Sequence, residues 1–139
     1  MSHVSKIELE VKSLEVLKKA CQQMGFQFMT NQKTYQWFGR WMNDTPLPEG
    51  VKVEDIGKCD HAIKVPGCHY EIGVVRLKDG YTLLWDYWHS GGLEQHIGPK
   101  AGKLKQAYAT ERIRQEAKLK GYRVSEKKMR KGVRLVLTV

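Results

Sequence analysis

The chain has 139 residues, the size of one ordinary domain. Its longest apolar runs, such as VRLVLTV, fall far short of the roughly 20 residues that cross a bilayer, and its N-terminus does not read as a signal sequence. Three cysteines without a framework spacing, Cys21, Cys59 and Cys68, argue against a disulfide-rich secreted protein. We therefore expect a soluble cytoplasmic protein with free thiols and no membrane contact.

The net charge of +9 is concentrated in one part of the chain. Residues 1–98 carry 11 Lys and Arg against 12 Asp and Glu, whereas residues 99–139 carry 13 against 3, a net charge of +10. This separation favours a polyanion as partner, although Lys-rich surfaces also serve solubility.

Two elements are predicted at the start of the chain. The alternation of Ile7, Leu9 and Val11 with charged residues predicts a half-buried strand. Ser13 suits the N-cap of a helix and Gly25 its end, and the apolar residues between them recur at helical spacing. The apolar stripe of this helix consists of Leu14, Leu17, Cys21 and Met24. We expect Cys21 to be a buried thiol.

The middle of the chain reads as strands around an inserted loop. The segment FQFMTNQKTYQWFGRW predicts a second strand and a turn, and residues 42–60 then lose periodicity, which is typical of a surface loop. The segments HAIKV, HYEIGVVRL and YTLLWDYW predict antiparallel strands, because the connections between them are too short for crossovers.

A long helix is predicted over residues 99–120, with Gly121 as its C-terminal stop, followed by the strands YRVSE and VRLVLTV around a basic turn. The order strand-helix-strands-helix-strand-strand indicates an α+β fold in one domain over residues 1–139. We expect an antiparallel sheet of about five to six strands with two helices packed on one face.

The chain offers weak candidates for catalysis or metal binding. Cys59, His61, Cys68 and His69 have ligand chemistry. A hairpin turned at residues 66–67 separates them, however, because it sets Val65 against Cys68 and His61 near Ile72. We predict no metal and no cofactor.

Glu71 and Asp86 lack a neighbouring His or second acid at a telling spacing. For Asp86, between Trp85 and Trp88, we expect a hydrogen-bonded or sheet-edge carboxylate, the alternative being a raised pKa through burial. No catalytic residue is assigned, and the absence of a motif favours a protein that is not an enzyme.

The glycine-rich approach to the long helix resembles a phosphate-binding loop only in part. Gly98, Gly102 and Lys103 are one residue too close for a Walker motif, and Leu104 replaces the Ser or Thr that such a motif requires. If Pro99 is the first helical residue, the free N–H groups of that turn, beside Lys100 and Lys103, form a small-anion or nucleotide site. The alternative is a flexible connector.

The long helix predicts a basic face. At 100° per residue one arc collects Lys100, Lys103, Glu111, Arg114 and Lys118. The opposite side collects Leu104, Tyr108, Ala109, Ile113 and Ala117. With Lys127, Lys128, Arg130 and Lys131 of the final turn, the basic arc predicts a surface for phosphates.

Aromatic residues of the strands are either stacking platforms for bases or core residues, the second being commoner. They are Trp37, Phe38, Trp41, Trp85, Tyr87 and Trp88.

Five segments, in order, carry a family resemblance: MSHVSKI, YEIGVV, YTLLWDYW, QAYATERIRQEAKLKGY and VRLVL. They resemble the hypothetical chloroplast open reading frame 35 family, or domain of unknown function 1257, with algal plastid, cyanobacterial and phage members. The resemblance excludes residues 42–60, and Ala107 and Thr110 depart from the family pattern. Residues that match the pattern include His3, Tyr70, Gly73, Asp86, Trp88, Gln106, Tyr108, Glu116 and Arg134.

The resemblance implies a small α+β protein without an assigned reaction, sometimes encoded near an AAA-type ATPase, and hence a possible adaptor. It also implies the plastid stroma for a plastid-encoded chain and the host cytoplasm for a phage-encoded one.

Three functions follow from these observations. The leading one is a non-enzymatic module that binds a polyanion, above all nucleic acid, through the basic C-terminal half. The second is a protein-interaction adaptor or oligomeric regulator that uses the aromatic segments QWFGRW and LLWDYW. The third is small-anion or nucleotide binding at the glycine-rich loop.

Overall fold

The computed structural model describes residues 2–128 and 132–138, without the side chains of Lys127 and Lys128. Its strands are β1 (Val4–Val11), β2 (Gln27–Met29), β3 (His61–Lys64), β4 (Glu71–Leu77), β5 (Gly80–Asp86), β6 (Arg123–Lys128) and β7 (Val133–Thr138). Its helices are α1 (Leu14–Gln23), α2 (Leu93–Ile97) and α3 (Gly102–Leu119), with short 3-10 turns η1 (Val53–Asp55), η2 (His89–Gly91) and η3 (Pro99–Ala101). The predicted α+β class is confirmed.

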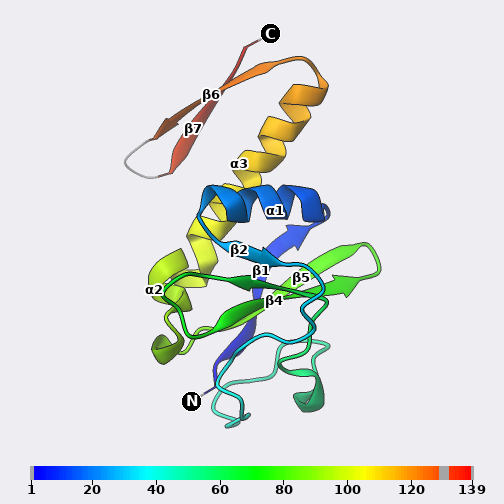
Figure 1. Cartoon of the computed structure of the whole chain (residues 1–139), viewed down its shortest axis with the longest axis vertical. Coiled ribbons are helices and arrows are strands. Elements are labelled where there is room, and N and C mark those ends of the chain that lie inside the picture. The colour runs from blue at the N-terminus through cyan, green and yellow to red at the C-terminus, as the bar shows by residue number, and fades with distance from the viewer. Residues whose placement is uncertain (1, 129–131, 139) are drawn as a thin grey trace.

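The main sheet has five antiparallel strands in the order β1-β5-β4-β3-β2. The three helices cover one face, where Leu17, Leu93 and Leu104 pack against Ile72 and Leu83. Because side chains alternate along a strand, Ala62 and Leu84 lie on the other face. There they pack with Tyr35 of the long loop between β2 and β3. One face therefore carries helices and the other a loop (Figure 1).

The first two elements agree with the sequence. In β1, Ile7 and Val11 are buried and the charged residues between them are exposed. The N–H of Val16 donates to Ser13 Oγ at 3.2 Å, which is the expected N-cap. Gly25 follows the helix with a φ of +75°, a left-handed conformation that glycine adopts without strain.

Two predicted elements of the middle region form but differ in detail from the prediction. The strand predicted from Phe26 onward is only three residues long, because the chain turns at Asn31 with a φ of 63°. The loop therefore spans residues 30–60 and not only 42–60. In the β3–β4 hairpin, Val65 accepts the N–H of Cys68 at 3.0 Å as expected. His61, however, pairs with Val74 and not near Ile72, because the turn contains two additional residues.

The helix predicted over 99–120 begins instead at Gly102. Lys100 and Ala101, just before it, adopt left-handed φ values of 55° and 59°, which interrupts a helix. Among the described residues no helix has both the length and the apolar character needed to cross a membrane.

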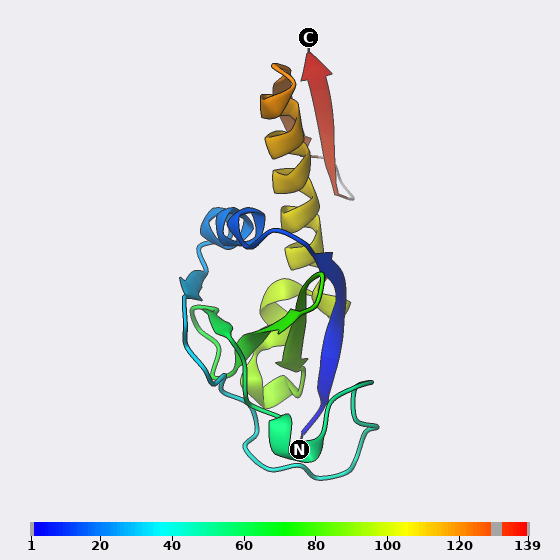
Figure 2. The same ribbon diagram turned by 90° about the vertical axis from the view of Figure 1, so that its right-hand side faces the viewer.

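The last two strands do not join the main sheet. They form a separate two-stranded sheet, β6–β7, beside the C-terminal half of α3. Figures 1 and 2 show this half of α3 and the hairpin standing away from the rest of the molecule. We call residues 112–128 and 132–138 the arm. The arm ends far from the N-terminus, which lies at the opposite pole (Figure 2).

Candidate functional site

The arm contains most of the basic segment. Each of the three acids after residue 98 lies beside an arginine: Glu116 is 3.7 Å from Arg112, Glu111 is 3.9 Å from Arg114, and Glu126 also pairs with Arg114. In contrast, four exposed basic residues of the arm form no ion pair within the described part of the chain. These are Lys118, Lys120, Arg123 and Arg134. The free positive charge of the arm is therefore presented to solvent.

The hairpin has two different faces. Glu126 pairs with Arg114 of α3, so the face with Glu126 and its cross-strand partner Leu135 is turned toward the helix. Because neighbouring residues of a strand point to opposite sides, Arg123 and Arg134 lie on the outer face. The hairpin therefore adds basic side chains to the side that faces away from α3.

The basic arc predicted on α3 was wrong in part. Glu111 is buried, whereas Ala109 and Ile113 of the predicted apolar side are exposed. The reason is that α3 packs against α1 and the sheet through Leu104 and Tyr108 and also contacts both strands of the hairpin, so no single stripe is buried. Lys100, Lys103 and Lys118 are exposed as expected, but Arg114 is held in ion pairs.

Four predicted phosphate contacts have no described side chain. Lys127 and Lys128 are described only as backbone of β6, and Arg130 and Lys131 lie outside the described residues. Their contribution remains a prediction from the sequence.

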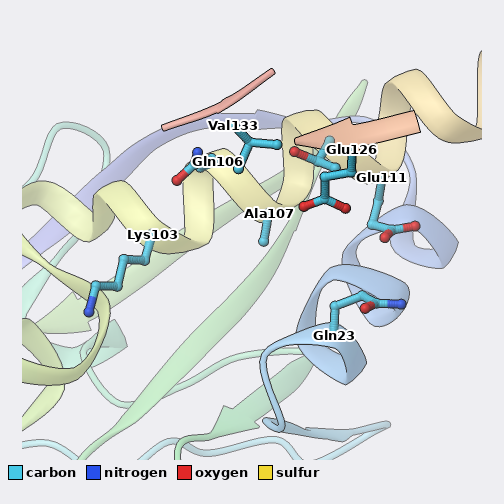
Figure 3. Close-up of a pocket in the computed structure, with 8 residues that line it drawn as sticks. Gln23, Lys103, Gln106, Ala107, Glu111, Glu126 and Val133 are labelled. Atoms are coloured by element: carbon cyan, nitrogen blue, oxygen red, sulfur yellow. The ribbon is translucent and has the colours of Figure 1, made fainter. Parts of the chain in front are cut away.

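Lys103 belongs to a small pocket beneath the hairpin. This pocket of about 150 Å³ is lined by Gln23, Gln106, Glu111, Glu126 and neighbouring residues. In Figure 3 the carboxylates of Glu111 and Glu126 point into the same space between α1 and α3, whereas the ammonium group of Lys103 points away from them. The pocket is too small and too acidic to hold a nucleotide.

The small-anion or nucleotide site that was predicted at the start of the long helix is altered by the kink at η3. Gly98 adopts a φ of 86°, Pro99 starts the short η3 turn and not the long helix, and Gly102 starts α3. Lys100 and Lys103 line two different cavities. The two lysines therefore do not converge on one phosphate as the sequence suggested.

Asp86 connects three segments of the molecule. This carboxylate is fully buried. Its Oδ1 accepts the N–H groups of His3 and Trp88, and its Oδ2 accepts that of Phe38, each at 3.0 Å. Asp86 thereby fixes the N-terminal segment, the long loop and the end of its own strand, which answers the sequence question in favour of a hydrogen-bonded carboxylate.

Glu71 plays a similar part at the neighbouring strand. Its Oε1 accepts the backbone N–H of Gln36 at 2.9 Å and the side-chain Nε2 of Gln32 at 3.0 Å. The register that pairs Gly73 with Leu84 places Glu71 and Asp86 on the same face and at the same end of β4 and β5. Sequence reasoning missed this pair of buried acids. The sequence did show that Glu71 is two residues from Gly73 and that Asp86 is two residues from Leu84. Residues two apart share one face of a strand, which is the part of the arrangement that a local pattern can indicate. Because both carboxylates are occupied by loop N–H donors, their role is to hold the loop.

Several other residues of the family pattern serve packing, and the rest lie at the pocket beneath the hairpin or on the arm. The ring of Tyr35 lies over Gly73, where an added Cβ would be 2.4 Å from Tyr35 Cδ1, and the ring of Tyr70 lies over Gly91 in the same way. The hydroxyl of Tyr108 accepts the N–H of Lys12 at 3.2 Å. Gln106 lines the pocket beneath the hairpin, and Glu116 and Arg134 are on the exposed arm.

His3 lies in an aromatic and acidic setting. Its Nε2 is 2.9 Å from Asp44 Oδ2, and its ring is 5.1 Å from that of Tyr87 and 5.0 Å from that of Trp88. This contact joins the N-terminal segment to the long loop. It adds to the hydrogen bond that the backbone N–H of His3 donates to Asp86. Trp88 of the family pattern therefore packs on His3.

The metal candidates of the sequence lie apart. Cys59 donates its thiol to the carbonyl of Gln32 on the loop side of the sheet, and Cys68 packs with the core on the helix side. His61 is engaged through Nδ1, which accepts the N–H of Asn31 at 2.9 Å. Within residues 2–128 and 132–138, no group of three His, Cys, Asp or Glu side chains is placed to hold a metal ion.

The raised pKa values of Cys21 and Cys59 predict that the free energy of unfolding declines in alkaline solution. Burial raises the pKa of Cys21 from 9.0 to about 12 and, together with the nearby Asp60 and Glu71, raises that of Cys59 to about 11. In the unfolded chain these thiols ionise near their ordinary pKa, so stability is full below pH 9 and falls as the pH rises toward the folded pKa. Urea denaturation at pH 8 and pH 10 should show this fall, and Cys21→Ala should reduce it. An unchanged fall in Cys21→Ala would contradict the assignment to Cys21.

Comparisons with known proteins identify a family and nothing closer. No curated protein and no solved structure matches the chain. The sequence model of the family described as "Protein of unknown function (DUF1257)" matches residues 45–136, which include α3, most of the hairpin, Glu71 and Asp86. This range contains most of the segment 42–60 that the resemblance left out. It begins at residue 45 and therefore does not include His3. The chain therefore belongs to the DUF1257 family of proteins of unknown function.

Proposed function

We propose that this protein is a non-enzymatic nucleic-acid-binding module and that the arm is its contact surface. The observation that carries the proposal is the charge of the arm: its acids are paired with arginines, whereas Lys118, Lys120, Arg123 and Arg134 are exposed and unpaired among the described residues. Unpaired basic side chains on a projecting element suit the phosphates of a duplex.

The shape of the arm supports duplex nucleic acid in particular. The major groove of B-DNA admits either an α-helix or a two-stranded β-ribbon. The β6–β7 hairpin is such a ribbon, and its outer face carries Arg123 and Arg134. No described element lies over that face in either view (Figures 1 and 2). The ribbon is therefore accessible to a groove.

The test compares two variants of equal charge. The arm variant combines Lys118→Glu, Lys120→Glu, Arg123→Glu and Arg134→Glu. The control variant combines Lys19→Glu, Lys33→Glu, Lys52→Glu and Lys78→Glu on the body, where all four lysines are exposed. Both variants have a formal net charge of +1, because four reversals subtract eight from +9. Circular dichroism establishes that both are folded.

We expect the wild type to bind labelled duplex DNA with an affinity that falls steeply between about 50 and 200 mM salt. The arm variant should lose binding and the control variant should retain most of it. Equal losses of DNA affinity in the two variants would show that binding depends on net charge and not on the arm. No binding by the wild type at low salt would refute the proposal. Single-stranded DNA and RNA in the same titration determine which nucleic acid is preferred.

A protein-interaction adaptor is the second candidate, and one observation favours it. The arm exposes Leu119 at 83%, Leu137 at 49% and Val136 at 44%. Leu119 lies at the end of α3, and Val136 and Leu137 point to opposite faces of the hairpin, so the arm exposes apolar side chains on more than one side, which suits an interaction surface. The aromatic segments are less suited, because Trp85 is buried and Trp37 packs against the loop-side cluster. A complex that resists salt and is lost in Leu119→Lys with Leu137→Lys would support the adaptor.

A further inference from the structure

A second cavity lies on the helix side of the sheet, away from the arm. It has a volume of about 420 Å³ and opens between β1, the end of β5 and the turn from α2 to α3. Its size is within the range of about 300 to 1,000 Å³ that small-molecule sites occupy. The strand β1 is an edge of the sheet, so no further strand of the sheet covers this side.

The inner wall of the cavity is aromatic and held in place. Trp85 is only 2% exposed, and its indole N–H donates to Ser5 Oγ at 3.1 Å. The ring of Tyr87 lies 6.2 Å from that of Trp85. Trp85 is itself covered by the core, but the partly exposed ring of Tyr87 beside it offers a surface on which a planar ligand can pack at little cost in side-chain entropy.

Three lysines from separate segments line the same cavity: Lys6 of β1, Lys100 of η3 and Lys105 of α3. None of them forms an ion pair within the described residues. The register that pairs Lys6 with Leu84 directs the Lys6 side chain to the other face of the sheet, so Lys100 and Lys105 supply the positive charge on the helix side. Like charges on one concave site raise its affinity for an anion. The position of Lys100 depends on two successive left-handed residues, Lys100 and the fully buried Ala101. Such a conformation persists only where the surrounding packing enforces it.

Two carboxylates, Glu8 and Glu94, also line the cavity, and Glu8 alternates with Ile7 along β1, so its side chain is directed to the other face of the sheet. The carboxylate of Glu94 disfavours a ligand that is anionic throughout and favours one that combines an anionic group with hydroxyl or amine donors. A mononucleotide has this combination, together with a planar ring. A polynucleotide does not fit, because its repeated phosphates would meet the carboxylate.

We propose that this cavity binds a mononucleotide. The base packs on the ring of Tyr87, the phosphate lies between Lys100 and Lys105, and the sugar or base donates hydrogen bonds to Glu94. The site is separate from the arm, so its existence does not depend on the nucleic-acid proposal.

The test is titration of the full chain with AMP, GMP, CMP and UMP, with adenosine and inorganic phosphate as probes of the two halves. Binding is followed by thermal unfolding and by amide chemical shifts. We expect at least one mononucleotide to raise the unfolding temperature and to shift the amides of residues 5–8, 85–87 and 100–105. Adenosine alone and phosphate alone should bind at least about tenfold more weakly, since each lacks one set of contacts.

Two lysines of α3 provide a matched pair of variants. Lys105→Glu should weaken the nucleotide at least about tenfold, whereas Lys103→Glu, which lines the other pocket, should leave binding within about twofold. Tyr87→Ala should weaken the nucleotide more than it weakens phosphate. The proposal fails if no mononucleotide shifts these amides at about 10 mM, if phosphate binds as well as the nucleotide, or if Lys103→Glu and Lys105→Glu act equally.

Discussion

Replacement of Asp86 by alanine will lower the free energy of unfolding by about 3–5 kcal/mol. The carboxylate is fully buried and accepts the N–H groups of His3, Phe38 and Trp88, so its removal leaves three backbone donors without their acceptor. A buried donor that loses a charged partner costs about 1–3 kcal/mol, and relaxation of the loop recovers part of the sum. Urea denaturation with a fitted m-value measures the change.

The control for this prediction is Glu10→Ala. Glu10 is an exposed acid whose ion pair with Lys12 is 3.4 Å long and lies at the surface. Such pairs contribute about 0–1 kcal/mol, so its removal should have little effect. Asp86→Asn provides a finer test, because the amide keeps one oxygen acceptor and presents N–H groups at the other position. It should be intermediate between the wild type and Asp86→Ala. Equal stability of Asp86→Ala and Glu10→Ala would overturn the central role of Asp86.

Replacement of Gly73 by alanine will destabilise the loop side of the sheet by about 1–3 kcal/mol. The added Cβ would lie 2.4 Å from Tyr35 Cδ1, and Tyr35 is only 3% exposed, so its ring has no free space into which it can move. The physical cause is overpacking and not backbone strain, because the φ of Gly73 is not positive. Thermal and urea unfolding measure the loss.

A double-mutant cycle with Tyr35→Ala isolates the contact. Tyr35→Ala alone is also destabilising, because it empties the cluster around Ala62 and Leu84. In that background, however, Gly73→Ala should cost much less than in the wild type, since the atoms that it meets are gone. Gly25→Ala is the contrasting glycine variant, because nothing lies within 4 Å of its added Cβ and only its φ of +75° opposes the change. Its loss should be the same with and without Tyr35. A full loss for Gly73→Ala in the Tyr35→Ala background would exclude the steric explanation.

These two predictions explain part of the family pattern in physical terms. Asp86 and Gly73 matched that pattern in the sequence, and both hold the long loop against the sheet: one accepts hydrogen bonds and the other leaves room for Tyr35. Trp88 and Tyr70 likewise pack within the molecule, on His3 and Gly91. Asp86 and Gly73 therefore preserve the loop-covered face, whereas Tyr70 packs against the core on the helix side. The proposed contacts of the arm rest instead on Lys118, Lys120, Arg123 and Arg134, of which only Arg134 matches the family pattern.

The sequence by itself determined the features that depend on near neighbours in the chain. The period of two in β1 and the cap at Ser13 are local signals, and both elements form as predicted. The α+β class followed from the order of such elements, and the position of the basic segment followed from composition.

Only the tertiary structure decided how these parts meet. Asp86 lies 83 residues from His3 and 48 from Phe38, so no local pattern shows that its carboxylate joins them. The kink at Lys100 and Ala101 placed Lys100 and Lys103 in different cavities. The packing of α3 on two sides buried Glu111 and exposed Ile113. The separation of β6–β7 from the main sheet produced the arm. Each of these outcomes depends on contacts between distant segments, whose free energies outweigh the local preferences from which the sequence was interpreted.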